Sequence, residues 1–294
     1  MARSHRTDWL YQAGWGVMFH YVYGSRHMNA EGPEDWNKLV DSFDVDGLAD
    51  QLAAVGAGYL LLTIAQHPPM NAPNSVFDRH VAAPRPVTTG RDLFADVAGA
   101  LEKRGMSLMA YSTYFAPCQE FDEGKSDEDQ TYPDWWPEGL AKYSRRWGQK
   151  VRGWWFDGQR GNEELNRRLA EAARAGNTDA ILAYNKPHGF QRNSKYEDYT
   201  AGDTPHAPDG RCTGRWVDGL QWHMLSFLGY SWGPTCGRSD NPRYSTEFVA
   251  GKSREIVSAG GVVTWDLPPL AGGLIPDAYL KQLAAVGRAV EGCR

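Results

Sequence analysis

Short apolar runs alternate with longer amphipathic runs along most of the chain. Continuous apolar runs that predict buried parallel strands fall at residues 16–23, 59–64, 106–112, 151–156, 180–184 and 261–265. Helical spacing of apolar residues follows at residues 44–55, 91–103, 135–149, 163–175, 246–258 and 278–290. Residues 222–232 predict one further unit without deciding between helix and strand. This alternation predicts an α/β protein, a single-domain (β/α)₈ TIM-type barrel over residues 1–294.

Polar residues follow these predicted strands where each strand ends. They are His20 and Tyr21, Gln66 and His67, Tyr111, Asp157, Asn185, and Asp266. In (β/α)₈ barrels the catalytic residues lie at the carboxyl ends of the strands, from several different strands. We therefore expect these side chains to converge on one functional site.

Asp157 is the most informative of these residues. It ends the run Trp154-Trp155-Phe156 and precedes Gly158, so a rigid strand delivers its carboxylate to a tight turn. A positioned carboxylate of this kind suits a nucleophile or a base. The alternative is that Asp157 caps the helix that begins near Asn162.

The segment 188–215 is rich in Gly, Pro and Asp, and long loops inside compact domains are usually functional. Its acids are Glu197, Asp198, Asp203 and Asp209. Asp203 follows Gly202, which permits an unusual turn. Cleavage of a glycosidic bond needs a second carboxyl group as acid/base, and this segment offers candidates. The alternative for each is a solvated loop acid.

His20 and His67, at the ends of neighbouring predicted strands, are expected to donate hydrogen bonds to ligand hydroxyls; the alternative is two core histidines. No His-x-His or His-Glu-x-x-His spacing occurs, so we expect no metal site and no cofactor.

Composition narrows the function classes. Twelve Trp and fourteen Tyr fit either a ring-rich core or a cleft whose flat faces suit sugars. A net charge of −5, with both signs spread along the chain, argues against nucleic acid and membrane partners. The polar N-terminus, the lack of a ~20-residue apolar run and four scattered cysteines predict a cytoplasmic protein with reduced thiols. The oligomeric state is not predicted.

Several stretches resemble the α-L-fucosidases of glycoside hydrolase family 29. Trp155-Phe156-Asp157-Gly158 resembles the family's nucleophile motif, and residues 16–20 resemble its first strand, which ends in a sugar-binding His. Residues 48–63, 218–233 and 275–287 resemble later parts of the family's barrel in the same order. The resemblance covers nearly the whole chain.

The chain also departs from the family pattern. The second strand of the family usually ends Lys-His-His-Asp-Gly-Phe, whereas this chain has Ala65-Gln66-His67-Pro68-Pro69-Met70. After His20 the expected Trp-Gly is Tyr21-Val22, and the C-terminal β-sandwich of the family is absent. Because several sugar-binding donors are lost, we expect simple α-L-fucosides to be poor substrates.

The resemblance implies a retaining glycoside hydrolase of carbohydrate metabolism that acts on a carbohydrate or glycoside. It implies Asp157 as nucleophile and Asp203 as acid/base, with Glu197 as the other candidate. The residues expected to bind the sugar are His20, His67, Gln66, Tyr111 and Asn185, with Trp155, Trp222 and Trp265 as stacking faces. The alternatives are a retaining hydrolase for a different sugar, an inactive carbohydrate-binding barrel, and a metal-dependent barrel hydrolase.

Overall fold

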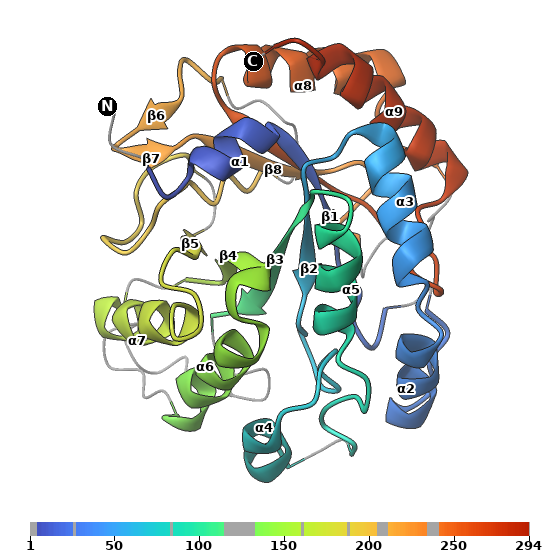
Figure 1. Ribbon diagram of the computed structural model, residues 1–294, viewed down its shortest axis with the longest axis vertical. Helices are drawn as coiled ribbons and strands as arrows, with labels where there is room; N and C mark the ends of the chain where they lie inside the picture. The colour runs from blue at the N-terminus through green and yellow to red at the C-terminus, as the bar shows by residue number, and fades with distance from the viewer. Residues whose placement is uncertain are drawn as a thin grey trace.

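The computed structural model describes residues 5–25, 28–82, 85–114, 133–159, 162–186, 189–204, 211–233 and 241–293. Seven parallel strands form one curled sheet in the order β5-β4-β3-β2-β1-β9-β8 (Figure 1). They are β1 (Trp15–Phe19), β2 (Tyr59–Thr63), β3 (Ser107–Thr113), β4 (Val151–Asp157), β5 (Ile181–Asn185), β8 (His223–Phe227) and β9 (Val262–Asp266). A separate antiparallel hairpin joins β6 (Trp216–Val217) to β7 (Leu220–Gln221).

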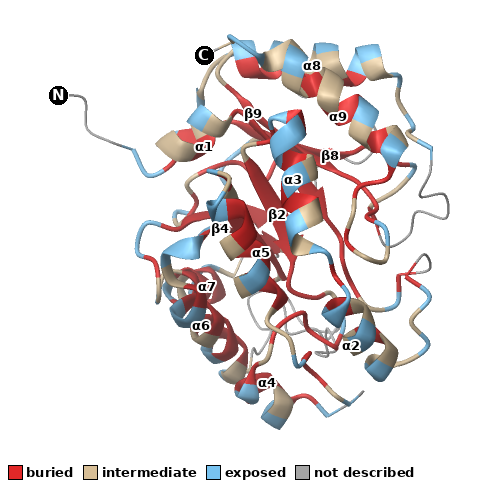
Figure 2. Ribbon diagram, turned by 45° about the vertical axis from the view of Figure 1, so that its right-hand side comes forward, coloured by how far each residue is buried: buried red, intermediate tan, exposed pale blue. Residues whose placement is uncertain are grey.

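Helices cover the outer side of the sheet (Figure 1). The long ones are α3 (Val45–Val55), α5 (Leu93–Glu102), α6 (Trp135–Trp147), α7 (Glu163–Ala173), α8 (Thr246–Ser258) and α9 (Asp277–Val290). The shorter ones are α1 (Asp8–Ala13), α2 (Pro33–Asp41), α4 (Ser75–His80) and the 3₁₀ turn η1 (Gly148–Lys150). Figure 2 shows that the strands of the curled sheet are buried along most of their length, whereas the helices expose one face.

The two faces of the sheet are both buried, which explains why its strands read as continuous apolar runs. On β2, for example, Leu60 and Leu62 pack in the layer beneath the helices. Tyr59 and Leu61, at the alternate positions, pack in the inner cluster enclosed by the curled sheet. The inner face thus presents every second residue of each strand to the enclosed space.

The structure confirms the predicted strands and long helices to within a few residues, and it resolves the undecided stretch 222–232 into strand β8 and a turn. Helix α7 is capped by Asn162, whose side chain accepts a hydrogen bond from the amide of Leu165. Asp157 is therefore not the cap of this helix. The short helices α1, α2 and α4 were not predicted.

The predicted closed barrel of eight strands was wrong, because the sheet has seven strands and two edges, β5 and β8. Residues 198–204 span the gap between these edges through a few backbone hydrogen bonds rather than a full ladder. The amide of Asp198 donates to the carbonyl of Leu182 in β5, and the amide of Thr204 donates to the carbonyl of Leu225 in β8. This irregular segment carries Asp203 into the inner layer.

Candidate active site

A pocket of about 210 Å³ lies at the carboxyl ends of the strands. Its lining residues are Met18, His20, Gln66, Tyr111, Trp155, Asp157, Asp203, Leu225 and Trp232. Seven segments that are far apart in the sequence contribute to it, as expected for a site formed by the ends of parallel strands. Six of the eleven sequence-predicted site residues line this pocket.

Asp157 is the last residue of β4, and the chain turns away at Gly158, which has a φ of +81°. The sheet register places Asn185 of β5 directly beside it. Asp157 Oδ1 accepts a hydrogen bond from Asn185 Nδ2 at 2.8 Å, and Oδ2 accepts one from the Tyr111 hydroxyl at 2.6 Å. Both carboxylate oxygens are therefore held by donors, which fixes the orientation of the carboxylate.

Asp203 reaches the same place from the irregular segment. Gly202, just before it, has a φ of +64° and lies against the backbone of His223, so a side chain there would be strained and would collide. Asn185 Nδ2 also donates to Asp203 Oδ2 at 2.9 Å. Because the two N–H bonds of an amide diverge by about 120°, the two accepting oxygens lie about 5 Å apart.

Tyr111 connects the pocket wall to Asp157. Burial, reinforced by the negative charge of Asp157, raises the pKa of the Tyr111 hydroxyl well above its ordinary value. The hydroxyl therefore stays protonated and gives its single hydrogen to Asp157. It accepts at 3.0 Å from Gln66 Nε2, which fixes the orientation of that amide. The Tyr111 ring stacks on Trp155 with centroids 5.4 Å apart.

His20 is buried and oriented by Asp266, the last residue of β9. Its Nδ1 lies 2.8 Å from Asp266 Oδ1, while Asp266 Oδ2 accepts from the amide of Gly233. Since a carboxylate only accepts, Nδ1 carries the hydrogen that is shared with Asp266, which leaves Nε2 as the ring nitrogen for a ligand hydroxyl.

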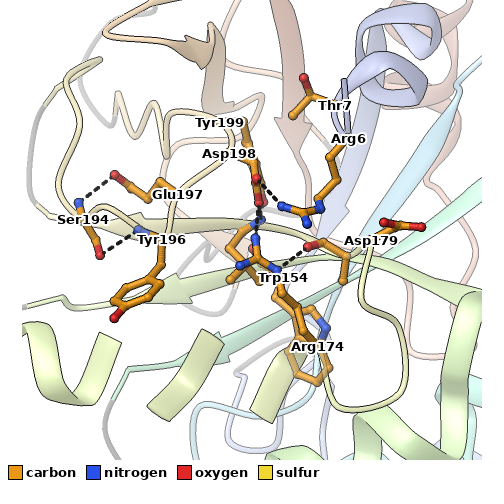
Figure 3. A network of polar contacts seen from close by, with 12 residues as sticks. Arg6, Thr7, Trp154, Arg174, Asp179, Ser194, Tyr196, Glu197, Asp198 and Tyr199 are labelled. Carbon is orange, nitrogen blue, oxygen red and sulfur yellow. Dashed lines mark hydrogen bonds and ion pairs between the residues drawn. The ribbon is translucent and has the colours of Figure 1, made fainter. Parts of the chain in front are cut away.

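Glu197, the other predicted acid/base, does not line the pocket. Its carboxylate accepts hydrogen bonds from the amides of Tyr184, Asn193 and Ser194 at 3.0, 2.6 and 2.9 Å. Burial raises the pKa of Glu197 to about 7, although these three backbone donors act in the opposite direction. Figure 3 shows this carboxylate directed at the loop backbone. Its contacts are those of a residue that holds the loop together.

The other loop acids are not in the pocket either. Asp198 forms ion pairs with Arg6 at 3.1 Å and with Arg174 at 2.6 Å, on a different side of the loop from Glu197 (Figure 3). Asp209 lies outside the described residues.

Four predicted sugar-binding residues do not line the pocket: Asn185, which contacts two of the lining residues, and His67, Trp222 and Trp265. His67 is exposed and follows Gln66, which does line it. Trp222 is buried and stacks on Phe190 with centroids 4.6 Å apart. Trp265 is fully buried, and its indole N–H donates to Ser253 Oγ of α8. The two tryptophans face the helix layer, so the prediction that they stack on a sugar was wrong.

Three residues of the site were not predicted as such: Met18, Leu225 and Trp232. Met18 carried a signal in the sequence, because it lies two residues before His20, whereas Asp266 was among the strand-end residues expected to converge on the site. Residues two apart on a strand point to the same face. Leu225 gave no signal because the pattern left its strand undecided, and Trp232 lies in the loop that follows.

Within the described ranges, no three His, Cys, Asp or Glu side chains are grouped as ligands of a metal ion. No helix in the same ranges has the length and apolar character needed to cross a membrane.

Solved structures with the same fold include several glycoside hydrolases. The endo-fucoidan hydrolase MfFcnA4 of family 107 matches with a TM-score of 0.71 at 15% identity, over 96% of this chain and 53% of that chain. The alpha-L-fucosidase AlfC from Lactobacillus casei matches with a TM-score of 0.71 at 13% identity, over 97% of this chain and 98% of that one. Alpha-L-fucosidase isoenzyme 1 from Paenibacillus thiaminolyticus gives 0.71 at 17% identity, over 99% and 76%. At these identities the likeness establishes the fold.

The chain spans about half the length of the fucoidan hydrolase MfFcnA4. A comparison with curated proteins gives no match. The family model described as alpha-L-fucosidase matches residues 5–292, which is almost the whole sequence. The chain therefore belongs to the alpha-L-fucosidase family.

Proposed function

We propose that this protein is a retaining glycoside hydrolase in which Asp157 is the nucleophile and Asp203 the acid/base. The observation that carries the proposal is the placement of two carboxyl groups on one pocket, about 5 Å apart and joined through Asn185 Nδ2. Retaining glycosidases separate their carboxyl groups by about 5–5.5 Å, whereas inverting enzymes need about 6.5–9.5 Å to admit a water molecule.

The different surroundings of the two carboxyl groups support different roles. Asp157 ends a strand, and both of its oxygens accept from fixed donors, Tyr111 and Asn185, which suits a nucleophile that must hold one orientation. Asp203 comes from the irregular segment 198–204 and accepts from Asn185 through Oδ2. We assign it the acid/base role, in which it donates a proton to the leaving oxygen.

The reaction follows in two steps. Asp157 attacks the anomeric carbon while the bond to the leaving oxygen breaks and the proton of Asp203 passes to that oxygen. A water molecule then attacks the anomeric carbon, gives a proton to Asp203, and releases Asp157 as a carboxylate. The first step leaves Asp203 deprotonated, as the second step requires. The second step restores the proton of Asp203 and the free carboxylate of Asp157.

The pocket fits the end sugar of a glycoside. Its volume is about 210 Å³. Sites for drug-sized ligands have volumes of about 300–1,000 Å³, so the smaller volume of this pocket suits one sugar unit. Met18, Leu225 and Trp232 give it apolar surface, while His20 and Gln66 offer polar atoms for hydroxyl groups. Family membership supports α-L-fucose as the sugar class. The second candidate substrate is a glycoside of another sugar. The Gln66 amide nitrogen donates to Tyr111, and the residues Pro68 and Pro69 that follow have no N–H to donate, so this loop offers few donors to the hydroxyl groups of fucose.

Kinetics of two variants on a panel of aryl glycosides test the assignment. Asp157→Ala should abolish turnover of every substrate, because no nucleophile remains. Asp203→Ala should keep the first step on substrates with good leaving groups and should regain turnover with azide. Glu197→Ala is the matched control and should show no azide rescue. If Asp157→Ala retains activity, or if Glu197→Ala shows the azide pattern instead, the assignment is wrong.

A further inference from the structure

Asn185 occupies a special position between the two carboxyl groups. It is the last residue of β5 and is buried, and its Nδ2 donates to Asp157 Oδ1 at 2.8 Å and to Asp203 Oδ2 at 2.9 Å. Its own Oδ1 is buried and makes no hydrogen bond to any residue that the structure describes. Within the described part of the chain, the side-chain hydrogen bonds of Asn185 are therefore made to the two acids.

The amide of Asn185 does not line the pocket, although both of its partners do. A residue that bound the sugar would present a polar atom to the cavity, but both hydrogens of this amide are used by carboxylates. The orientation of the amide is also fixed chemically. A carboxylate only accepts, so the nitrogen and not the oxygen must face Asp157.

We propose that Asn185 is a positioning residue that sets the separation of the two acids. This inference rests on the proposed function of the site. One hydrogen to each acid holds the two carboxyl groups at a fixed distance, which a donor with a single hydrogen could not do.

The neighbouring elements support a rigid arrangement. The ladder between β4 and β5 pairs Asp157 with Asn185, so the sheet register holds these two residues side by side. The carbonyl of Asn185 accepts from the amide of Gln159, which fixes the backbone just after the strand. Asp203, in contrast, comes from an irregular segment with only isolated bridges. The amide of Asn185 thus links Asp203, which lies in the irregular segment, to Asp157, which is held in the sheet.

The test compares Asn185→Ala and Asn185→Ser with the matched control Asn177→Ala. Asn177 is also buried, and its Nδ2 donates to the carbonyl of Val151 at the opposite end of β4. The readouts are kcat, KM, the pH–rate profile and the melting temperature on an aryl glycoside that the wild type turns over. Asn185→Ala should lower kcat by about 100-fold, since a misplacement of about 1 Å costs that much, and should change KM less than threefold.

The acidic limb of the pH–rate profile should move to higher pH by at least one unit in Asn185→Ala, because Asp157 and Asp203 lose their common donor. Asn185→Ser keeps one donor and should lie between the wild type and Asn185→Ala in kcat and in the position of that limb. Asn177→Ala should lower the melting temperature and leave the pH–rate profile unchanged. If Asn185→Ala does not fold, Asn185→Ser carries the test.

Two results would overturn the inference. One is an unchanged pH–rate profile in the folded Asn185 variants. The other is a large rise in KM with kcat retained, which would make Asn185 a sugar-binding residue. Either result leaves the proposed function standing if Asp157→Ala is inactive, whereas activity of Asp157→Ala would remove the proposed function itself.

Discussion

At the scale of single residues, hydrogen-bond chemistry decides which atom carries each proton. The Tyr111 hydroxyl has one hydrogen and gives it to Asp157, so Gln66 must donate to it. His20 must carry a hydrogen on Nδ1 because Asp266 faces that nitrogen. These constraints define two chains of hydrogen bonds at the pocket. One runs from Gln66 through Tyr111 to Asp157, and the other joins Asp266 to His20.

Replacing Tyr111 tests one of these chains. Tyr111→Phe keeps the ring that stacks on Trp155 but removes the hydroxyl that donates to Asp157 Oδ2 and holds this carboxyl group in place. The loss of one preorganised donor costs about 10²–10³ in rate in comparable sites, so kcat should fall by about 100-fold. The melting temperature should change little, because the apolar contacts remain.

Tyr199→Phe is the matched control for this measurement. Tyr199 is also fully buried in the inner layer, and its hydroxyl donates to the carbonyl of Trp154 rather than to a carboxylate. Tyr199→Phe should cost stability by about 1 kcal/mol and leave kcat within a few fold. Equal kcat values for the two variants would remove Tyr111 from the catalytic machinery.

At the scale of elements, the strands could be predicted from the sequence. The side of the sheet that each strand residue faces could also have been predicted, because side chains alternate along a strand. Trp155 lies two residues before Asp157 on β4 and shares its face, whereas Trp265 is next to Asp266 on β9 and faces the helices. Alternation does not account for Gln66, which lines the pocket although it lies beyond the end of β2 and shares the parity of Leu60 and Leu62. Residues 198–204 could not be predicted as a bridge across the sheet edges, because they have no strand periodicity and rely on contacts with β8.

Gly202 tests the importance of that bridging segment. Its φ is +64°, and a Cβ would meet the carbonyl oxygen of His223. Gly202→Ala should therefore displace Asp203 and lower kcat by about 100-fold. Gly214→Ala, where a Cβ meets nothing within 4 Å, should behave like the wild type. The comparison uses kcat with the melting temperature as a check, and full activity of Gly202→Ala would show that the segment tolerates the shift.

At the scale of the whole molecule, two buried titratable groups act on stability with opposite signs. Burial lowers the pKa of His223 to about 4 from 6.5, so the unfolded chain binds more protons between these values. The free energy of unfolding therefore falls as the pH drops from 6.5 to 4. Burial raises the pKa of Glu197 to about 7 from 4.5, so the free energy of unfolding falls as the pH rises from 4.5 to 7. Each effect is about 3 kcal/mol.

Denaturant unfolding between pH 4.5 and 6.5 checks this opposition, because the two slopes partly cancel in the wild type. Glu197→Gln should leave the His223 slope, so its free energy of unfolding should rise with pH over this range. His223→Asn should leave the Glu197 slope and show a fall instead. Burial holds His223 neutral, although its contact with the Thr200 carbonyl acts in the opposite direction, and Asn cannot titrate in its place. The same pH dependence in both variants would contradict the two buried pKa values.

The covalent glycosyl-enzyme is the most direct test of the central claim that Asp157 attacks the sugar with Asp203 as its partner. The enzyme is stopped with the 2-deoxy-2-fluoro form of the sugar that it hydrolyses best, and the peptides are mapped by mass spectrometry. The account predicts the added mass of one fluorosugar on the peptide that contains Asp157, and no addition to the same peptide from Asp157→Asn. An adduct on a different residue, or an inverted first-formed sugar with no adduct at all, would contradict it.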